Sequence, residues 1–457
     1  MSNTGAHILV YPFPASGHII PLLDLTRQLL TRGLTVTVLV YPSDLPLLQP
    51  LLSCHASASI QPLVLGSLPE LPSSPQTRLP AKLRATTALY DPIVQWFRSH
   101  PNPPVAIVSD FFLGWTHRLA TELGVPRVAF WPSGAFCGSI YNSLWRDLPK
   151  NDDPTNENNE IFFADVPNSP KYPWWQITPY VRGPDSEFFR ENMLANFKSW
   201  GTVFNSFTEL ERVYIDHLKK EMGHNRVWAV GPLLPPSSND QVGLTDRGGS
   251  SAVPAHEVMT WLDGKRDDSV VYVSFGSRLG LTRRQTEVLA AALERSEVNF
   301  IWCVQGHVAD DGGSIPDGFE ERVGDRGFIV RGWAPQVPIL SHRAVGAFVT
   351  HCGWNSVLEG VAAGVLMLTW PLGADQYIDA NLLVDQLGLA VRACVGGVQN
   401  VPELGELTRL LAESVGGSRP ERTRVKEMRG AARNAINKGG SSTRDLDELV
   451  EKLSELS

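Results

Sequence analysis

Short apolar segments rich in β-branched residues recur along this chain and alternate with longer segments of helical periodicity. Strands that are apolar on both faces are typical of a parallel sheet covered by helices, and a strand, helix, strand succession forms right-handed crossover units. In the first half we expect strands at His7–Phe13, Leu34–Pro42, Ser59–Leu65, Pro104–Phe112, Val125–Trp131, Val203–Ser206 and Val227–Pro232. The alternation predicts a doubly wound α/β domain over residues 1–231.

A linker and a second domain follow. Residues 232–254 consist largely of Pro, Gly, Ser and charged residues, a composition that cannot bury apolar surface. The alternation then resumes, with expected strands at Val270–Ser277, Asn299–Val304, Gly327–Gly332, Gly346–Thr350, Val365–Trp370 and Leu389–Cys394. Because 457 residues exceed what one hydrophobic core supports, we expect a second α/β domain over residues 255–457.

The expected strand Gly346–Thr350 leads directly into the start of a helix. His351, Gly353, Asn355 and Ser356 lie at this start, and the amphipathic segment after them ends at Gly364. Free backbone N–H groups and the positive end of the helix dipole favour phosphate at such a position. The sequence therefore predicts a phosphate site here.

Other residues near this helix suit a nucleotide sugar. Trp333 offers a flat face for a base, and the Glu359 carboxylate can accept hydrogen bonds from two ribose hydroxyls. Asp375 and Gln376, after the next expected strand, can bind hydroxyls of a sugar.

The whole segment Trp333–Gln376 resembles the C-terminal signature of the plant UDP-dependent secondary-product glycosyltransferases of family 1. The similarity extends over nearly the whole chain. The segments PVAIVSDFFLGW, NSFTELE and EMGHNRVWAVGP, with Leu366 where many members have Pro, resemble most the subgroup of flavonol 7-O- and benzoate glucosyltransferases. The resemblance implies the GT-B fold: two Rossmann-like domains that face each other across a cleft, with the C-terminal helix Arg419–Leu456 packing back on the N-terminal domain.

Two residues of the first half are candidates for the chemistry. His18 lies in the turn between the first expected strand and its helix, and a position at the start of a helix suits a neutral base. Asp110 ends another strand at the same edge of the sheet, where it can orient His18. A helix beginning at Phe112 would also explain Asp110 as an N-cap, and this alternative stays open. In the resembling family a catalytic His and its Asp partner match both residues.

The resemblance implies an inverting transfer of glucose from UDP-glucose to a phenolic hydroxyl, with UDP-rhamnose or UDP-xylose as alternative donors. Trp333 and Ala334 would bind uracil, Gln336 and Glu359 the ribose, and Trp354, Asp375 and Gln376 the sugar. In the resembling family, a glutamine at the position of Gln376 usually accompanies glucose as the donor sugar, although this is only a tendency. The remaining donor-binding positions, next to the phosphates, would be Ser277, His351, Gly353, Asn355 and Ser356. Structural roles stay open for Ser277, Gln336, Trp354 and Glu359. No Asp-x-Asp motif occurs near these elements, so we expect no metal and no cofactor.

The acceptor site is less defined. We expect Phe112 and Ser133 to line it, with a flavonol (the 7-hydroxyl favoured) or a hydroxybenzoate as acceptor. Residues 150–186 are polar, Pro-rich and aromatic. Their aromatic side chains could line the pocket or could simply hold the loop on the surface.

Composition excludes several other functions. A net charge of −8 gives no basic surface for nucleic acid or anionic lipid. No apolar run approaches the ~20 residues that span a bilayer, and the five scattered cysteines suggest reduced thiols, so we expect a cytoplasmic monomer. The chain lacks the G-x-G-x-x-G fingerprint of nicotinamide dehydrogenases. A non-catalytic binding protein of this fold stays an alternative: it predicts the loss of catalytic residues, and His18 and Asp110 are both present, which is necessary for turnover but does not prove it.

Overall fold

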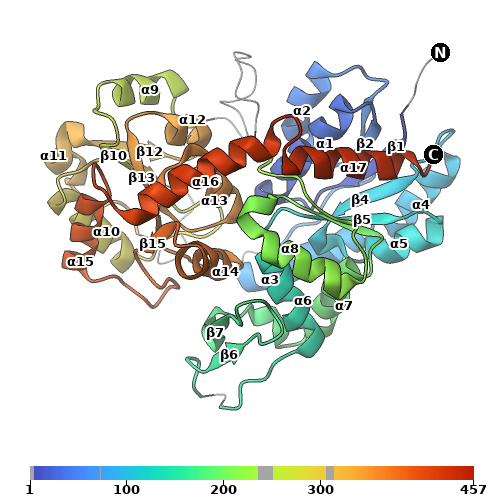
Figure 1. Ribbon diagram of the computed structural model, residues 1–457, viewed down its shortest axis with the longest axis horizontal. Helices are drawn as coiled ribbons and strands as arrows, with labels where there is room; N and C mark the ends of the chain where they lie inside the picture. The colour runs from blue at the N-terminus through green and yellow to red at the C-terminus, as the bar shows by residue number, and fades with distance from the viewer. Residues whose placement is uncertain (1–4, 73, 154, 235–250, 305–312) are drawn as a thin grey trace. The chain divides into compact units, whose positions relative to one another are not determined.

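The computed structural model describes residues 5–72, 74–153, 155–234, 251–304 and 313–457, without the side chains of residues 75 and 76 (Figure 1). The chain divides into two compact units. The first contains residues 1–235 and 434–457, and the second contains residues 236–433. Most of the expected linker, residues 235–250, lies outside the described residues.

The first unit contains a seven-stranded, fully parallel sheet with strand order β3-β2-β1-β4-β5-β8-β9. Its strands are β1 (His7–Tyr11), β2 (Thr35–Leu39), β3 (Ile60–Leu63), β4 (Ala106–Asp110), β5 (Arg127–Trp131), β8 (Gly201–Phe204) and β9 (Val227–Ala229). Each lies within or next to a segment expected from the sequence. The predicted α/β architecture is confirmed.

Helices connect these strands. They are α1 (Ser16–Thr31), α2 (Leu45–Cys54), α3 (Pro75–Thr87), α4 (Tyr90–Ser99), α5 (Thr116–Leu123), α6 (Ala135–Asp147), α7 (Ser186–Phe197) and α8 (Thr208–Met222), with short 3-10 turns η1 (Pro42–Asp44), η2 (Phe111–Leu113), η3 (Trp174–Gln176) and η4 (Pro179–Val181). The periodicity predicts one helix over Lys82–Ser99, whereas the structure has α3 and α4. Pro92 lacks the N–H that a continuous helix needs, and it is tolerated in the first turn of α4.

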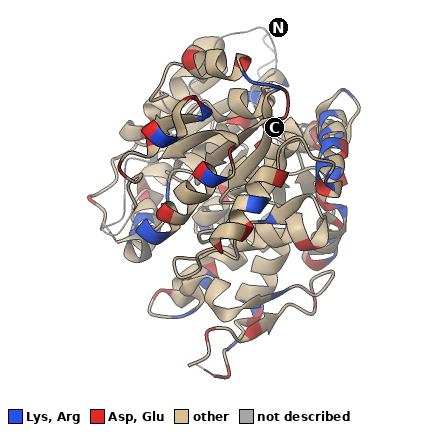
Figure 2. Cartoon of the chain, turned by 90° about the vertical axis from the view of Figure 1, so that its left-hand side faces the viewer, with Lys and Arg blue, Asp and Glu red and all other residues tan. Residues whose placement is uncertain are grey.

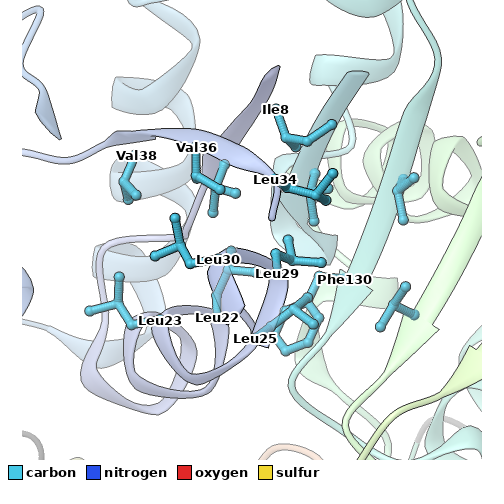
Figure 3. Close-up of a cluster of buried hydrophobic side chains, with 14 of the residues drawn as sticks. Ile8, Leu22, Leu23, Leu25, Leu29, Leu30, Leu34, Val36, Val38 and Phe130 are labelled. Atoms are coloured by element: carbon cyan, nitrogen blue, oxygen red, sulfur yellow. The ribbon is translucent and has the colours of Figure 1, made fainter. Parts of the chain in front are cut away.

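Helix α1 covers the centre of this sheet. Figure 3 shows its leucines packed against strand residues, among them Ile8, Val36 and Phe130, all fully buried. Burying a leucine side chain contributes roughly 1.5–3 kcal/mol, so this contact fixes the start of α1 relative to the end of β1.

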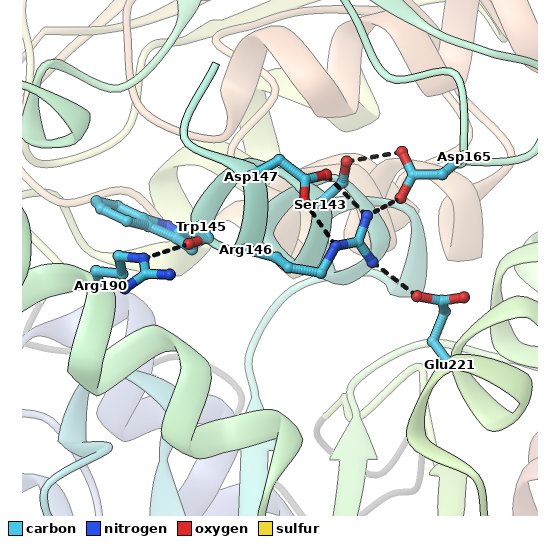
Figure 4. A network of polar contacts seen from close by, with 7 residues as sticks. All are labelled: Ser143, Trp145, Arg146, Asp147, Asp165, Arg190 and Glu221. Atoms are coloured by element: carbon cyan, nitrogen blue, oxygen red, sulfur yellow. Dashed lines mark hydrogen bonds and ion pairs between the residues drawn. The ribbon is translucent and has the colours of Figure 1, made fainter. Parts of the chain in front are cut away.

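The segment 150–186 is held to the body of the first unit by a polar network. It contains the hairpin of β6 (Glu160–Phe162) and β7 (Lys171–Pro173). Figure 4 shows Arg146 of α6 in contact with Asp147, Asp165 and Glu221, and Ser143 Oγ lies 2.7 Å from Asp165 Oδ1. Asp165 thus ties the segment to α6.

The aromatic residues of this segment also contact the protein. The Trp174 ring is buried beneath the Arg182 guanidinium, 4.9 Å from its centroid, and Tyr180 stacks on Phe189 of α7 at 4.3 Å. For Trp174 and Tyr180 these contacts fit the alternative in which aromatic side chains hold the loop in place.

The last helix belongs to the first unit. The sequence predicts one helix over Arg419–Leu456, but the structure has α16 (Pro420–Ile436) and α17 (Ser441–Ser454), separated by a turn in which Gly439 has a φ of 80°. Leu446, Leu449 and Leu453 of α17 belong to the same hydrophobic core as the buried residues of α1 and of the sheet. The carboxylate of Asp445 accepts the Ala229 N–H at 2.8 Å, which fixes α17 against β9.

The second unit contains a six-stranded parallel sheet of order β12-β11-β10-β13-β14-β15. Its strands are β10 (Val270–Ser274), β11 (Asn299–Val304), β12 (Gly327–Arg331), β13 (Val345–Thr350), β14 (Leu366–Thr369) and β15 (Ala390–Arg392). Besides α16, its helical segments are α9 (Ala255–Asp263), α10 (Arg283–Arg295), α11 (Phe319–Val323), η5 (Gly324–Arg326), α12 (Gln336–Ser341), α13 (Trp354–Ala363), α14 (Gln376–Asn381), the π-helical turn η6 (Leu382–Gln386) and α15 (Leu404–Glu413). Every expected strand of this half is present.

Each sheet has one position at which the strand order reverses. It lies between β1 and β4 in the first unit and between β10 and β13 in the second. In open α/β sheets, ligands bind at the carboxyl ends of the strands at this position. The topology therefore places one candidate site in each unit.

Charged residues of both signs are interspersed along the chain (Figure 2), consistent with 40 basic and 48 acidic residues. Among the described helices, none combines the length and the apolar composition that crossing a lipid bilayer requires.

Candidate active site

In the first unit, His18 and Asp110 lie where the strand order reverses. His18 is the third residue of α1, just after β1, and Asp110 is the last residue of β4. His18 Nδ1 lies 2.8 Å from Asp110 Oδ2. The Asp110 side chain is 0% exposed and that of His18 is 17% exposed. The second ring nitrogen, Nε2, has no hydrogen-bond partner in the described part of the chain. This is the geometry of a base held by an orienting carboxylate.

The Asp110 carboxylate also caps the 3-10 turn that follows β4. Its other oxygen, Oδ1, accepts the backbone N–H of Phe112 at 2.9 Å and so caps η2. The two alternatives for Asp110, partner of His18 and N-cap, are therefore both realised, one by each carboxylate oxygen. Two charge-assisted hydrogen bonds leave the carboxylate little rotational freedom.

Aromatic rings surround His18. The imidazole stacks on Phe112 with centroids 5.0 Å apart, and the Phe13 ring meets it edge-on at 5.4 Å. Phe111 continues the stack to Trp131 at 4.4 Å. The half-buried Phe112 thus lies next to His18, and its contact with an acceptor stays a prediction. A planar phenol would find flat apolar faces here.

Ser133 lies in the turn between β5 and α6. It is 1% exposed, and its Oγ is buried without a hydrogen-bond partner among the described residues. Its role at the acceptor stays a prediction.

In the second unit, His351 follows β13 and lies next to two glycines. A Cβ added to Gly276 or Gly353 would fall 2.5 or 2.6 Å from His351 Nε2, so a side chain at either position would displace the His351 ring. Gly276 follows β10 with a φ of 73°, and Gly353 is the N-cap of α13. Burial lowers the pKa of His351 to about 4, so the ring is neutral at pH 7. Its Nδ1 is buried without a partner among the described residues. Nε2 therefore lies beside the start of α13, where phosphate is favoured.

Gln336 and Glu359 are joined directly. Gln336 Nε2 donates to Glu359 Oε2 at 2.7 Å and to Ser356 Oγ at 2.9 Å. The buried hydroxyl of Tyr272 lies 3.2 Å from Gln336 Oε1. Tyr272 thereby sets which way the amide faces.

Trp333 and Ala334 form the turn before α12. The Trp333 carbonyl accepts the Ala252 N–H at 2.8 Å, and the Ala334 carbonyl accepts the Gln336 N–H at 2.8 Å. The half-buried Trp333 indole stacks on no aromatic ring of the described residues. The turn thus fixes the backbone on either side of the indole.

Gln376 begins α14 and is 7% exposed. Its Oε1 accepts the backbone N–H groups of Leu372 at 2.8 Å and Gly373 at 3.0 Å. Because two N–H donors require an oxygen there, Nε2 is the polar atom left for a ligand. Gln376 can therefore donate to a sugar hydroxyl.

The other predicted donor-binding residues lie close by in the chain. Asp375 is the N-cap of α14, Trp354 is buried in the first turn of α13, and the half-buried Asn355 follows it. Ser277 lies in an exposed turn, because β10 ends at Ser274 rather than at Ser277 as expected from the sequence.

The structure adds three residues that the sequence analysis did not single out: Tyr272, Gly276 and Arg127, whose Nη2 donates to the Asp110 carbonyl at 3.2 Å. The first two lie in or just after the apolar strand β10, where their sequence context indicates only core and turn. Within the described ranges, no group of three or more His, Cys, Asp or Glu side chains is arranged to hold a metal ion.

Two parallel α/β units, one with a His–Asp pair and the other with a phosphate-type helix start beside a Gln–Glu pair, define the class of GT-B nucleotide-sugar transferases. A family model described as "UDP-glucoronosyl and UDP-glucosyl transferase" matches residues 245–399. UDP-glycosyltransferase 89B2 of Stevia rebaudiana is 51% identical, over 99% of this chain and 98% of the relative. Flavonol 3-O-glucosyltransferase UGT89B1 of Arabidopsis thaliana is 50% identical, over 98% of this chain and 96% of the relative.

A solved structure agrees. The crystal structure of Arabidopsis thaliana UGT89C1 complexed with UDP-L-rhamnose superimposes with a TM-score of 0.81 at 38% identity, covering 99% of this chain and 100% of that one. The chain belongs to the plant UDP-glycosyltransferases, and the resemblance noted from the sequence is confirmed.

Proposed function

We propose that this enzyme transfers glucose from UDP-glucose to a hydroxyl of a flavonol or hydroxybenzoate, with inversion, to give a β-O-glycoside. The observation that carries the proposal is the 2.8 Å contact between His18 Nδ1 and the buried Asp110, which leaves His18 Nε2 as a base. A base held in this way can remove the proton of an acceptor hydroxyl.

In the proposed reaction, His18 Nε2 takes the acceptor proton while the oxygen attacks the anomeric carbon of the UDP-sugar. The bond from that carbon to the β-phosphate oxygen breaks, and its electron pair leaves with UDP. Asp110 stabilises the imidazolium that forms, through the hydrogen bond to Nδ1.

Charge on the departing UDP needs stabilisation at the β-phosphate. The N-terminus of α13, whose N-cap is Gly353, supplies free N–H groups and the positive end of a helix dipole. The neutral His351 can donate from Nε2. We propose that Ser277, Asn355 and Ser356 contact the phosphates, and that no metal or other cofactor takes part.

We propose that the Gln336–Glu359 pair holds the ribose, that Trp333 and Ala334 bind the uracil, and that Trp354, Asp375 and Gln376 hold the sugar. The name of UGT89B1, a flavonol 3-O-glucosyltransferase at 50% identity, supports glucose and a flavonol. The resemblance of the sequence favours the 7-hydroxyl, whereas UGT89B1 is named for the 3-hydroxyl. The attachment position must therefore be measured.

Rhamnose is the second candidate sugar. UGT89C1, 38% identical to this chain, was solved with UDP-L-rhamnose. A donor hydrogen bond from Gln376 does not by itself exclude a deoxyhexose.

The experiment incubates purified protein separately with UDP-glucose, UDP-rhamnose and UDP-xylose against flavonols and hydroxybenzoates. Products are identified by mass, and the linkage position and anomeric configuration by NMR. His18→Ala should abolish the product, while His217→Ala, a change on α8 in the same unit, should not. An α-glycoside from UDP-glucose, or full turnover by His18→Ala, would contradict the mechanism. Size-exclusion chromatography of the same sample tests our expectation of a monomer.

A further inference from the structure

Arg127, the first residue of β5, has a guanidinium buried in the centre of the first unit. The residue is 1% exposed. Nε donates to Ser109 Oγ and Thr116 Oγ1, both at 2.8 Å, and Nη1 donates to Ser199 Oγ at 2.8 Å. Nη2 donates to Asn196 Oδ1 at 3.0 Å and to the carbonyls of Asp110 at 3.2 Å and Leu113 at 3.4 Å. Every one of these partners is a neutral oxygen.

A buried cation without a carboxylate bonded to it is costly, because a charge loses its hydration when it leaves water. Burial lowers the pKa of Arg127 to about 9, and the negative charge of Asp110 is the interaction that opposes this shift. Arg127 also donates to the carbonyl of Asp110 itself. Arg127 and Asp110 are thus two buried residues of opposite charge, joined by a hydrogen bond to the Asp110 backbone rather than by a direct ion pair between the described side chains.

The groups around this pair are few. On the carboxylate side, His18 of α1 contacts Asp110. On the guanidinium side, His117 of α5 feels the positive charges of Arg127 and of Lys198, just after α7, and its pKa is lowered, mainly by burial and then by these two charges. Neither His117 nor Lys198 can balance the charge of Arg127.

We propose that Arg127 is a positioning residue for the reaction: its buried positive charge balances Asp110 while His18 is neutral, and its hydrogen bond holds the end of β4. The inference rests on the proposed roles of His18 and Asp110. Neutral His18, the Asp110 carboxylate and the Arg127 guanidinium together carry no net charge. When His18 takes the acceptor proton, the three residues together become positively charged. Arg127 therefore acts, through Asp110, on the step in which His18 takes the proton.

The sign of the effect follows. Removing the positive charge makes protonation of His18 easier, so Arg127→Gln should move the titration of His18 to higher pH. The acid limb of the kcat/KM profile should move in the same direction. Arg127→Lys keeps a basic group at this position and should shift His18 less than Arg127→Gln does, although burial favours the neutral form of a lysine. Both variants lose hydrogen bonds and should have a lower Tm.

The test uses full-length protein labelled with ¹³C-histidine. NMR follows the 11 histidines through a pH titration, and the His18 signal is assigned by its absence in His18→Asn. Asn196→Asp is a second variant, in which a carboxylate next to Arg127 opposes the charge of the guanidinium, although the variant loses the amide donor to the carbonyls of Phe111 and Asn192. This variant should move the titration of His18 to higher pH, as Arg127→Gln does. The proposal can therefore be tested even where Arg127→Gln fails to fold.

The inference is supported when both charge-neutralising variants move the His18 titration to higher pH by at least half a pH unit and Arg127→Lys moves it less. It is overturned when Tm falls but His18 titrates as in the wild type in all three variants, since Arg127 would then be only a structural clamp. Full turnover by His18→Ala would instead overturn the proposed catalytic role. The NMR titration would still report whether Arg127 acts on His18.

Discussion

Gln336 donates a hydrogen bond to Glu359 at 2.7 Å, which joins two side chains that lie 23 residues apart in the sequence. Tyr272 fixes the other end of the same amide, at 3.2 Å from Gln336 Oε1. Tyr272 is a central residue of the buried strand β10, so it does not move with the loops. The proposed ribose contacts are therefore arranged before the donor binds, which reduces the cost of ordering them on binding.

We expect Tyr272→Phe to weaken donor binding. The variant loses one hydrogen bond to Gln336, worth about 0.5–1.5 kcal/mol, so the KM for the UDP-sugar should rise roughly 2- to 10-fold with little change in kcat. Steady-state kinetics at varied donor concentration measures this.

Tyr11→Phe is the matched control, because it removes a buried hydroxyl, bonded to Tyr41 at 3.2 Å, in the first unit. It should leave the KM for the donor unchanged. Equal effects of the two changes would mean that Tyr272 does not act on Gln336.

Two substitutions of Asp110 should separate a loss of activity from a loss of stability. Asp110→Asn keeps an oxygen for the Phe112 N–H but cannot stabilise a protonated His18, so kcat should fall about 10²–10⁴-fold. Asp110→Ala should lose as much activity and, relative to Asp110→Asn, about 1 kcal/mol more of unfolding free energy from the lost cap, because both variants leave the charge of Arg127 unbalanced.

Kinetics and denaturant unfolding of the two variants separate these effects. The double variant His18→Ala/Asp110→Asn should be no slower than His18→Ala alone, because the two residues act as a unit. Near-normal kcat in Asp110→Asn would leave Asp110 with the capping role only.

The sheets and the candidate pairs could be predicted from the sequence for a physical reason. A strand buried between two layers of helices needs apolar residues on both faces, so each strand is a short apolar run visible in the sequence. Polar residues just after such runs, including His18 and His351, must lie at the ligand-binding edge. The fold and much of the site follow from these two rules.

The remaining features depend on contacts that no local pattern contains. Arg127 is buried only because Ser109, Thr116, Asn196 and Ser199 converge on it from separate segments. Helix α2 contains Pro46 and Pro50, which lower helix propensity, and tertiary packing of Leu48 and Leu51 outweighs them. The sequence showed two reasons for Asp110 but not that its two oxygens serve both.

Gln376→Glu should weaken the interaction with the sugar of the donor but not the interaction with its nucleotide. The carboxylate can still accept the N–H groups of Leu372 and Gly373, so the turn is kept, while the N–H donor to the sugar is lost. We expect kcat/KM for UDP-glucose to fall about 10- to 100-fold, from the cost of an unmade hydrogen bond.

Product inhibition provides the internal control for Gln376. UDP lacks the sugar, so its inhibition constant should be the same for Gln376→Glu and the wild type. If UDP inhibition weakens as much as turnover, the substitution disturbs the nucleotide site and Gln376 does not act on the sugar.

His351 should make stability depend on pH. Burial lowers its pKa from 6.5 to about 4, so between these values the unfolded chain binds a proton that the folded protein does not. The contribution is therefore complete above pH 6.5 and is lost as the pH falls to about 4, with an upper bound of about 3 kcal/mol. Burial lowers the pKa of His7, His117, His217 and His224 as well, which adds to the trend.

The variant His351→Gln isolates this contribution because glutamine does not titrate. Wild type and variant are compared by thermal unfolding at pH 8, 7, 6 and 5. Both should lose Tm as the pH falls, since the other histidines remain, but the wild type should lose more. The Tm of the wild type minus the Tm of His351→Gln should therefore decrease as the pH falls from 8 to 5. A difference that stays constant from pH 8 to pH 5 would show that His351 titrates alike in the folded and unfolded protein, so that it is not held neutral beside α13.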